Sequence, residues 1–132
     1  MTLADAENLY AEALKLQLSG AELLADLEGV CRECNGIGAE WMGGFLRGLV
    51  TALNPTLNPV AAIHDRRYAV CKSAEEQKFA DDEFRENGRK AAYRYGWWRP
   101  RRYVVLRNTN VFYAALRVAG HKAWEENKNA DR

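Results

Sequence analysis

The sequence predicts an all-α, mainly helical protein. Three observations support this fold class: apolar residues recur at helical spacing, residues that cap helices precede these segments, and Gly or Pro separates them. The chain has 132 residues, of which 48% are hydrophobic. We therefore expect a single domain, residues 1–132, with a hydrophobic core that needs neither disulfides nor metal.

The first helix is expected to begin after Thr2, because Asp5 stands at the spacing of an N-terminal cap. It should continue to Ser19-Gly20, with an apolar stripe formed by Leu3, Tyr10, Leu14 and Leu18. A short second helix is expected over residues 21–30. Four glycines between residues 31 and 45 then favour a loop.

Two helices are predicted in the middle of the chain. Pro59, in the pair Asn58-Pro59, suits the first turn of a helix that should end near Cys71. Ser73 and Glu76 form a capping box, so the next helix is expected over residues 74–95.

The C-terminal part is less regular. Gly96 and Pro100 interrupt the helical pattern, and residues 103–106 suit either a short strand or the beginning of a helix. We expect the segment Asn108–Asn110 to cap a C-terminal helix over residues 109–126. Its expected core contacts are Val111, Ala115, Val118 and Ala119, with Phe112 and Leu116 beside them.

Charge and cysteine content limit the possible partners and compartments. A net charge of +1 excludes a general electrostatic attraction to nucleic acid or anionic lipid. However, residues 89–122 contain nine Lys or Arg and no Asp or Glu, so a local basic surface is expected. Three cysteines do not suit a disulfide-stapled secreted domain. The N-terminal residues lack the apolar segment of a signal peptide, so we expect synthesis in the cytoplasm.

The stretch from Ile63 to Tyr68 carries the strongest indication of chemistry. On a helix, His64 and Tyr68 share a face, whereas Asp65 points in another direction and can hold a cation. Asp81, from the next helix, can pair with His64. A histidine base, a carboxylate that fixes its tautomer and a second carboxylate for a metal are the parts of a site that activates water.

The order of motifs along the chain resembles the phospholipase A2 superfamily. It reads Asn35-Gly-x-Gly, then His64-Asp-x-x-Tyr, then Asp81-x-x-Phe. The resemblance covers residues 31–95 and is closest to small bacterial and phage-type domains and to the phospholipase domain of parvovirus capsid proteins. It implies a core of two antiparallel helices with a glycine-rich calcium loop, to which this chain adds N-terminal helices (3–30) and a C-terminal helix.

The resemblance also implies an activity and a role for each motif residue. The activity is calcium-dependent hydrolysis of the sn-2 ester of glycerophospholipids at a membrane surface. His64 would be the base that activates water, Asp81 would orient it, and Tyr68 would hydrogen-bond Asp81. The implied calcium ligands are Asp65 and the backbone carbonyls of Gly36, Ile37 and Gly38, with Gly43 of a second glycine loop as an alternative.

The partner of His64 and the identity of the metal each have an alternative. Asp82 competes with Asp81 for His64. We prefer Asp81 because it stands three residues before Phe84, which is the spacing that the resemblance to the phospholipase A2 superfamily implies. Zinc is an alternative metal, because Cys31 and Cys34 have the spacing of half a zinc site, with Cys71 and His64 as further ligands.

The segment from Tyr93 to Tyr103 mixes aromatic residues with arginines. Such a segment suits docking to a membrane interface or contact with a nucleic-acid backbone. We expect at least one of Trp97 and Trp98 to pack in the core, because tryptophan is usually well buried. The alternative function is therefore a non-catalytic interaction protein that uses this surface. In either case the resemblance suggests a phage protein associated with the virion, or an effector delivered by a secretion machine, with a corresponding partner protein.

Overall fold

The computed structural model describes residues 2–33 and 55–120, and every regular element within these ranges is a helix. The predicted all-α class is thus confirmed. The long helices are α1 (Leu3–Lys15), α4 (Asn58–Val70), α5 (Ala74–Ala92) and α6 (Pro100–Ala115). The short ones are the 3₁₀-helices η1 (Ala21–Leu24) and η2 (Pro55–Leu57), the α-helix α2 (Leu27–Glu33) and the π-helix η3 (Leu116–Gly120).

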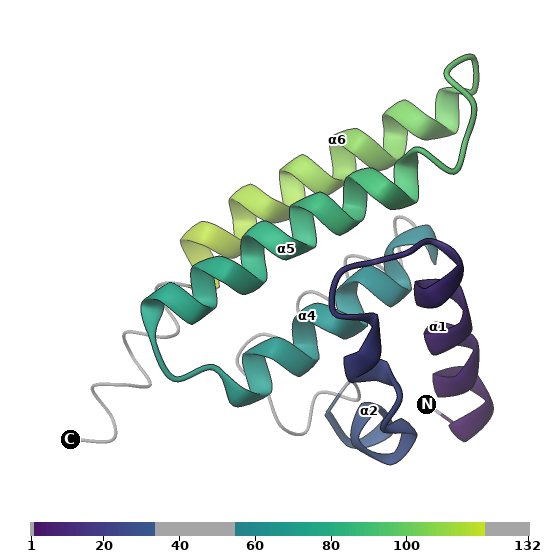
Figure 1. Ribbon diagram of the computed structural model, residues 1–132. Coiled ribbons are helices and arrows are strands. Elements are labelled where there is room, and N and C mark those ends of the chain that lie inside the picture. Colours follow the sequence, from purple (N-terminus) through teal and green to yellow (C-terminus); the bar gives the residue numbers. More distant parts are fainter. Residues whose placement is uncertain (1, 34–54, 121–132) are drawn as a thin grey trace.

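Helix α5 lies at the centre of the arrangement. It runs antiparallel to α4 on one side and antiparallel to α6 on the other, and α1 and α2 pack against α4 (Figure 1). The motif residues of the sequence lie on α4 and α5, which are joined by a short turn after Val70. None of the described helices is both long enough and apolar enough to cross a membrane.

Helix α1 begins as predicted, but it buries a different face. The Asp5 amide donates to Thr2 Oγ1 at 3.1 Å, and the Thr2 amide donates to Asp5 Oδ2 at 3.0 Å, so both halves of the capping box form. The fully buried residues are Ala6 and Ala13, whereas Leu3 and Leu14 of the predicted apolar stripe are exposed. Small side chains on the inner face let α1 lie close to its neighbours.

The predicted second helix is in fact two elements. The 3₁₀-helix η1 ends at Leu24, and α2 begins at Leu27. The break has a local cause, because Asp26 Oδ1 accepts a hydrogen bond from the Gly29 amide at 3.1 Å. A side chain that caps a new helix competes with continuation of the preceding one.

The last helix begins at Pro100 rather than at residue 109, and residues 103–106 belong to it. Proline at the first turn suits a helix N-terminus, since its missing N–H would have no partner there. The expected cap at Asn108–Asn110 therefore lies in the middle of α6. Thr109 is buried there, and its Oγ1 donates to the Val105 carbonyl at 2.8 Å, which satisfies the hydroxyl within the helix.

The face that the last helix buries was only partly predicted. Phe112 and Leu116 are buried. They are four residues apart, so they lie on the same face of the helix, and this face packs against the core. Val111 and Val118 are exposed, so these two expected core contacts were wrong. The side chain of Ala119 and the helix end expected near residue 126 lie outside the described residues.

Gly88 sets the distance between α5 and α6. A Cβ added at this position would overlap Cγ2 and Oγ1 of Thr109. Substitution of Gly88 by Ala is therefore expected to lower the free energy of unfolding by about 1–3 kcal/mol, although Ala is favoured over Gly by about 1 kcal/mol in an unhindered helix. Urea denaturation monitored by circular dichroism measures the change. The double variant Gly88→Ala, Thr109→Ala should recover part of the loss, and a Gly88→Ala protein as stable as wild type would show that the helices are not in tight contact here.

Candidate functional site

His64 lies in the buried part of α4. Its side chain is 1% exposed, and its imidazole ring packs against Tyr68 with a centroid distance of 4.1 Å. The ring of Phe84 on α5 meets it edge-on at 5.6 Å. Two aromatic contacts from different helices therefore restrict the orientation of the imidazole.

Asp81 on α5 accepts hydrogen bonds from three donors although it is 0% exposed. Its Oδ1 lies 2.8 Å from His64 Nε2 and also accepts a hydrogen bond from the Tyr68 hydroxyl at 2.5 Å. Its Oδ2 accepts a hydrogen bond from Arg117 Nη1 at 2.8 Å. A buried carboxylate is costly unless hydrogen bonds or opposite charge compensate it, and here both oxygens are satisfied.

This arrangement assigns the proton on the histidine. An ionised carboxylate only accepts hydrogen bonds, so Nε2 of His64 is the donor to Asp81. Nδ1 is buried and has no hydrogen-bond partner among the described residues. With Nε2 as the donor to Asp81, Nδ1 is the ring nitrogen on which a neutral imidazole would carry its lone pair.

Tyr68 is a donor that does not ionise. Burial raises the pKa of its hydroxyl, and the negative charge of Asp81 raises the pKa further. The phenol therefore stays protonated at any physiological pH and continues to donate to Asp81. The predicted contacts among His64, Tyr68 and Asp81 are all present.

Asp82, the competing candidate, faces different partners. Lys78 Nζ donates to its Oδ2 at 2.8 Å, and the Tyr113 hydroxyl donates to its Oδ1 at 2.7 Å. These two hydrogen bonds, the one from Lys78 first, lower the pKa of Asp82. Asp82 is therefore a partly exposed carboxylate that connects α5 with α6, and it is not the partner of His64.

Arg117 was not anticipated from the sequence. It belongs to η3 and brings a positive charge to Asp81 from the far end of the chain. A signal was present, because Arg117 is the one charged residue between Asn108 and Gly120. A lone charge in an apolar helical segment usually has a specific partner, but the sequence does not reveal which one.

The predicted calcium site is described only at Asp65. This residue is buried on α4, and its side chain points about 100° away from that of His64, as consecutive helix residues do. Gly36, Ile37, Gly38 and Gly43 lie outside the described residues. Within residues 2–33 and 55–120, no three His, Cys, Asp or Glu side chains gather where a metal could bind.

The described members of the alternative zinc site, Cys31, Cys71 and His64, do not form a cluster that could hold a metal. Cys31 Sγ donates to the Thr2 carbonyl at 3.5 Å, Cys71 Sγ donates to the Ser73 carbonyl at 3.4 Å, and His64 Nε2 is engaged by Asp81. Cys34 lies outside the described residues.

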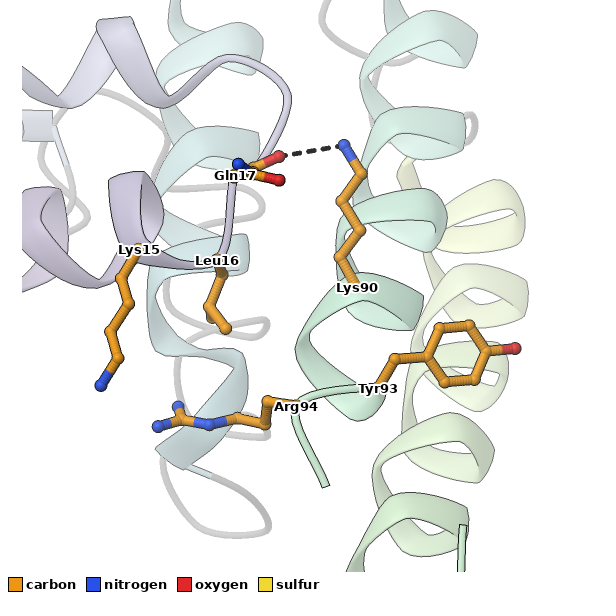
Figure 2. Close-up of a pocket in the computed structure, with 6 residues that line it drawn as sticks. All are labelled: Lys15, Leu16, Gln17, Lys90, Tyr93 and Arg94. Atoms are coloured by element: carbon orange, nitrogen blue, oxygen red, sulfur yellow. Dashed lines mark hydrogen bonds between the residues drawn. The ribbon is translucent and has the colours of Figure 1, made fainter. Parts of the chain in front are cut away.

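A shallow depression of about 640 Å³ lies elsewhere, between the end of α1 and the end of α5 (Figure 2). It is lined by Lys15, Leu16, Gln17, Lys90, Tyr93 and Arg94. Lys90 Nζ donates across it to the Gln17 carbonyl at 3.1 Å. None of the motif residues lines this depression, so it is a separate, basic surface feature.

Comparisons with known proteins do not assign a family. No family model, curated protein or solved structure matches the chain. The class of site is therefore defined by its own geometry, as a buried histidine–aspartate pair between two antiparallel helices, supported by a tyrosine and an arginine.

We expect Asp81 and its neighbour Asp82 to differ sharply in their contribution to stability. Replacing Asp81 by Asn leaves the buried donors His64 and Tyr68 and the partly exposed Arg117 with a poorer acceptor. The change should lower the free energy of unfolding by about 2–4 kcal/mol. The matched change Asp82→Asn alters a partly exposed pair and should cost less than about 1 kcal/mol. Urea denaturation of both variants measures the difference, and equal losses would contradict the central role of Asp81.

Proposed function

We propose that this protein is a calcium-dependent hydrolase that cleaves the sn-2 ester of glycerophospholipids with water activated by His64. The observation that carries the proposal is the asymmetry of the imidazole. Its Nε2 lies 2.8 Å from the buried carboxylate of Asp81, while its Nδ1 has no hydrogen-bond partner among the described residues. The motif order of the sequence supports the choice of a phospholipid ester as substrate.

In the proposed reaction, Nδ1 of His64 removes a proton from a water molecule as the water oxygen attacks the ester carbonyl carbon. The imidazolium that forms is stabilised by Asp81 at Nε2. When the bond between the carbonyl carbon and the glycerol oxygen breaks, His64 returns the proton to the departing oxygen. The products are a fatty acid and a lysophospholipid, and the histidine is neutral again.

Tyr68 and Arg117 would act through Asp81. The Tyr68 hydroxyl shares Oδ1 with His64, and Arg117 holds Oδ2, so the carboxylate has little freedom to rotate away from the imidazole. Both are positioning residues, since neither needs to contact the substrate.

The calcium ion would be held by Asp65 together with the backbone carbonyls of residues 36–38. Carboxylate and carbonyl oxygens are the ligands that Ca²⁺ prefers, and the ion tolerates irregular geometry. When bound, it supplies positive charge that polarises the ester carbonyl and stabilises the oxyanion.

Burial of the pair favours a second candidate function. His64 is only 1% exposed, so the His64–Asp81 contact can serve purely to hold α4 and α5 together. The protein would then be a non-catalytic component of a phage or of an effector system. Its basic aromatic surface would bind a partner protein or nucleic acid.

Fatty-acid release from mixed phospholipid vesicles separates the two functions. His64→Gln is expected to lower the rate at least roughly 100-fold, because it removes the general base. The matched control is His121→Gln, at the one other histidine of the chain, and it should retain the rate. A calcium chelator should abolish release by the wild type. Release that persists in chelator, or in the His64 variant, would exclude the proposed mechanism.

Calcium should also raise the melting temperature, because a ligand that binds only the native state stabilises it. A free calcium concentration about 100 times the dissociation constant corresponds to roughly 2.7 kcal/mol. Asp65→Asn should remove most of this effect, whereas Asp82→Asn should keep it. Differential scanning calorimetry with calcium and with chelator measures the shift. The same shift in wild type and in the Asp65 variant would rule out Asp65 as a ligand.

A further inference from the structure

Two neighbouring tryptophans protrude from the turn between α5 and α6. Trp97 is 73% exposed and Trp98 is 65% exposed, so the expectation that one of them packs in the core was wrong. Tyr93 and Tyr103 beside them are exposed as well. Tryptophan is highly buried on average, and an exposed cluster of large aromatic residues usually marks a binding surface.

The turn that carries the two tryptophans is held by specific hydrogen bonds. The Arg99 amide donates to the Gly96 carbonyl at 2.9 Å, and the Tyr103 hydroxyl donates to the Trp97 carbonyl at 2.5 Å. The Trp98 indole packs across Gly96 so closely that a Cβ there would lie 2.7 Å from its Nε1. The backbone is thus held by specific contacts while both indoles face solvent.

Arginines surround these rings. Arg99 stacks over Trp98 with its guanidinium carbon 4.9 Å from the ring centre, and Arg102 stacks over Tyr93 at 4.3 Å. In the described part of the chain, no carboxylate forms an ion pair with Arg99, Arg101 or Arg102, and residues 89–122 contain no acidic residue. We call Tyr93, Trp97, Trp98, Arg99, Arg101, Arg102 and Tyr103 the aromatic-basic tip.

The tip has the shape of a projection. Figure 1 shows that the α5–α6 turn extends beyond the other helices at one end of the hairpin. The basic depression shares Tyr93 with the tip and adds the cations Lys15, Lys90 and Arg94 next to it (Figure 2). Arg94 is partly compensated, because its Nη1 lies 3.7 Å from Glu12 Oε2.

We propose that the aromatic-basic tip docks the protein onto an anionic phospholipid bilayer. Indole rings favour the membrane interface, where their apolar body is buried and their N–H stays hydrated. Guanidinium groups around them pair with lipid phosphates, and the positive charge is attracted to an anionic surface. Single-stranded nucleic acid also stacks on aromatic residues, but the proteins that bind it this way align those residues along a basic groove, whereas both tryptophans lie on a turn that projects beyond the other helices (Figure 1).

The docking surface and the His64–Asp81 pair are separate. Asp81 lies eleven residues before Ala92, the end of α5, which corresponds to roughly 17 Å of helix. Membrane docking adds a binding surface to the proposed hydrolase function. It rests on that function only for the choice of a phospholipid surface. Binding to the bilayer needs neither calcium nor the histidine, so the two proposals can fail independently.

Vesicle flotation in the presence of a calcium chelator tests the proposal. The vesicles contain phosphatidylcholine alone, or phosphatidylcholine with about one-third phosphatidylglycerol, which makes the surface anionic. Wild type should float with the anionic vesicles and not with the neutral ones. Arg99→Gln, Arg101→Gln should weaken binding roughly 30-fold, and Trp97→Ala, Trp98→Ala should weaken it at least as much.

Two matched variants control for charge and for exposed apolar area. Lys72→Gln, Arg107→Gln removes the same charge from exposed positions outside the tip, and Val70→Ala, Phe79→Ala trims two exposed apolar residues near the start of α5. Both should bind like wild type. Melting curves confirm that each variant is folded, which is expected because every substituted residue is exposed.

The outcomes separate the possible occupants. Equal binding by wild type and both tip variants would overturn the proposal, as would retention of a single-stranded oligonucleotide by the tip with no flotation on anionic vesicles. His64→Gln should float like wild type. If wild type floats through its tip but releases no fatty acid, docking stands and the hydrolase proposal fails. If it releases fatty acid and its tip variants float unchanged, the docking proposal fails alone.

Discussion

The buried carboxylate of Asp81 is the constraint on which the rest of the structure depends. A charge taken fully out of water costs several kcal/mol unless donors surround it. Here α4 supplies His64 and Tyr68, and η3 supplies Arg117. These contacts fix how α4, α5 and η3 lie relative to one another. Removing one partner from such a group is costly because the other buried polar atoms are left unpaired, whereas replacing the whole group by apolar residues is often nearly neutral.

A second polar layer on α5 strengthens the same arrangement. Glu83 accepts two hydrogen bonds from Arg67 on α4, both at 3.0 Å, and a third from Ser19 at 2.8 Å. Asn87 exchanges two hydrogen bonds of 2.8 Å with the backbone of Ser19. Helix α5 therefore carries polar residues on faces that are buried, which only works because the neighbouring segments provide matching partners. The imidazole of His64 therefore lies between two helices, α4 and α5, that are joined by several further hydrogen bonds.

The candidate catalytic pair and the proposed docking surface lie in different parts of the molecule. The His64–Asp81 pair lies between α4 and α5, where aromatic rings and buried donors surround it. The aromatic-basic tip lies at the turn after α5, where the side chains face solvent. Because α5 contributes to both, it connects the candidate catalytic pair to the candidate membrane surface through one continuous helix.

The sequence by itself determined the all-α class, the beginnings of α1, α4 and α5, and the pairing of His64 with Asp81. The helix beginnings depend on local signals, namely cap residues, a proline and helical spacing. The choice of Asp81 came from its match to the motif spacing of the phospholipase A2 superfamily. The tertiary structure alone decided the burial of Thr109 in the middle of α6, the role of Arg117 and the exposure of Trp97 and Trp98. The physical reason is that each depends on where other segments of the chain lie. Thr109 is buried because it packs against Gly88 of α5, and Arg117 is held by the buried carboxylate of Asp81. The two tryptophans are exposed because the hairpin turn extends beyond the other helices.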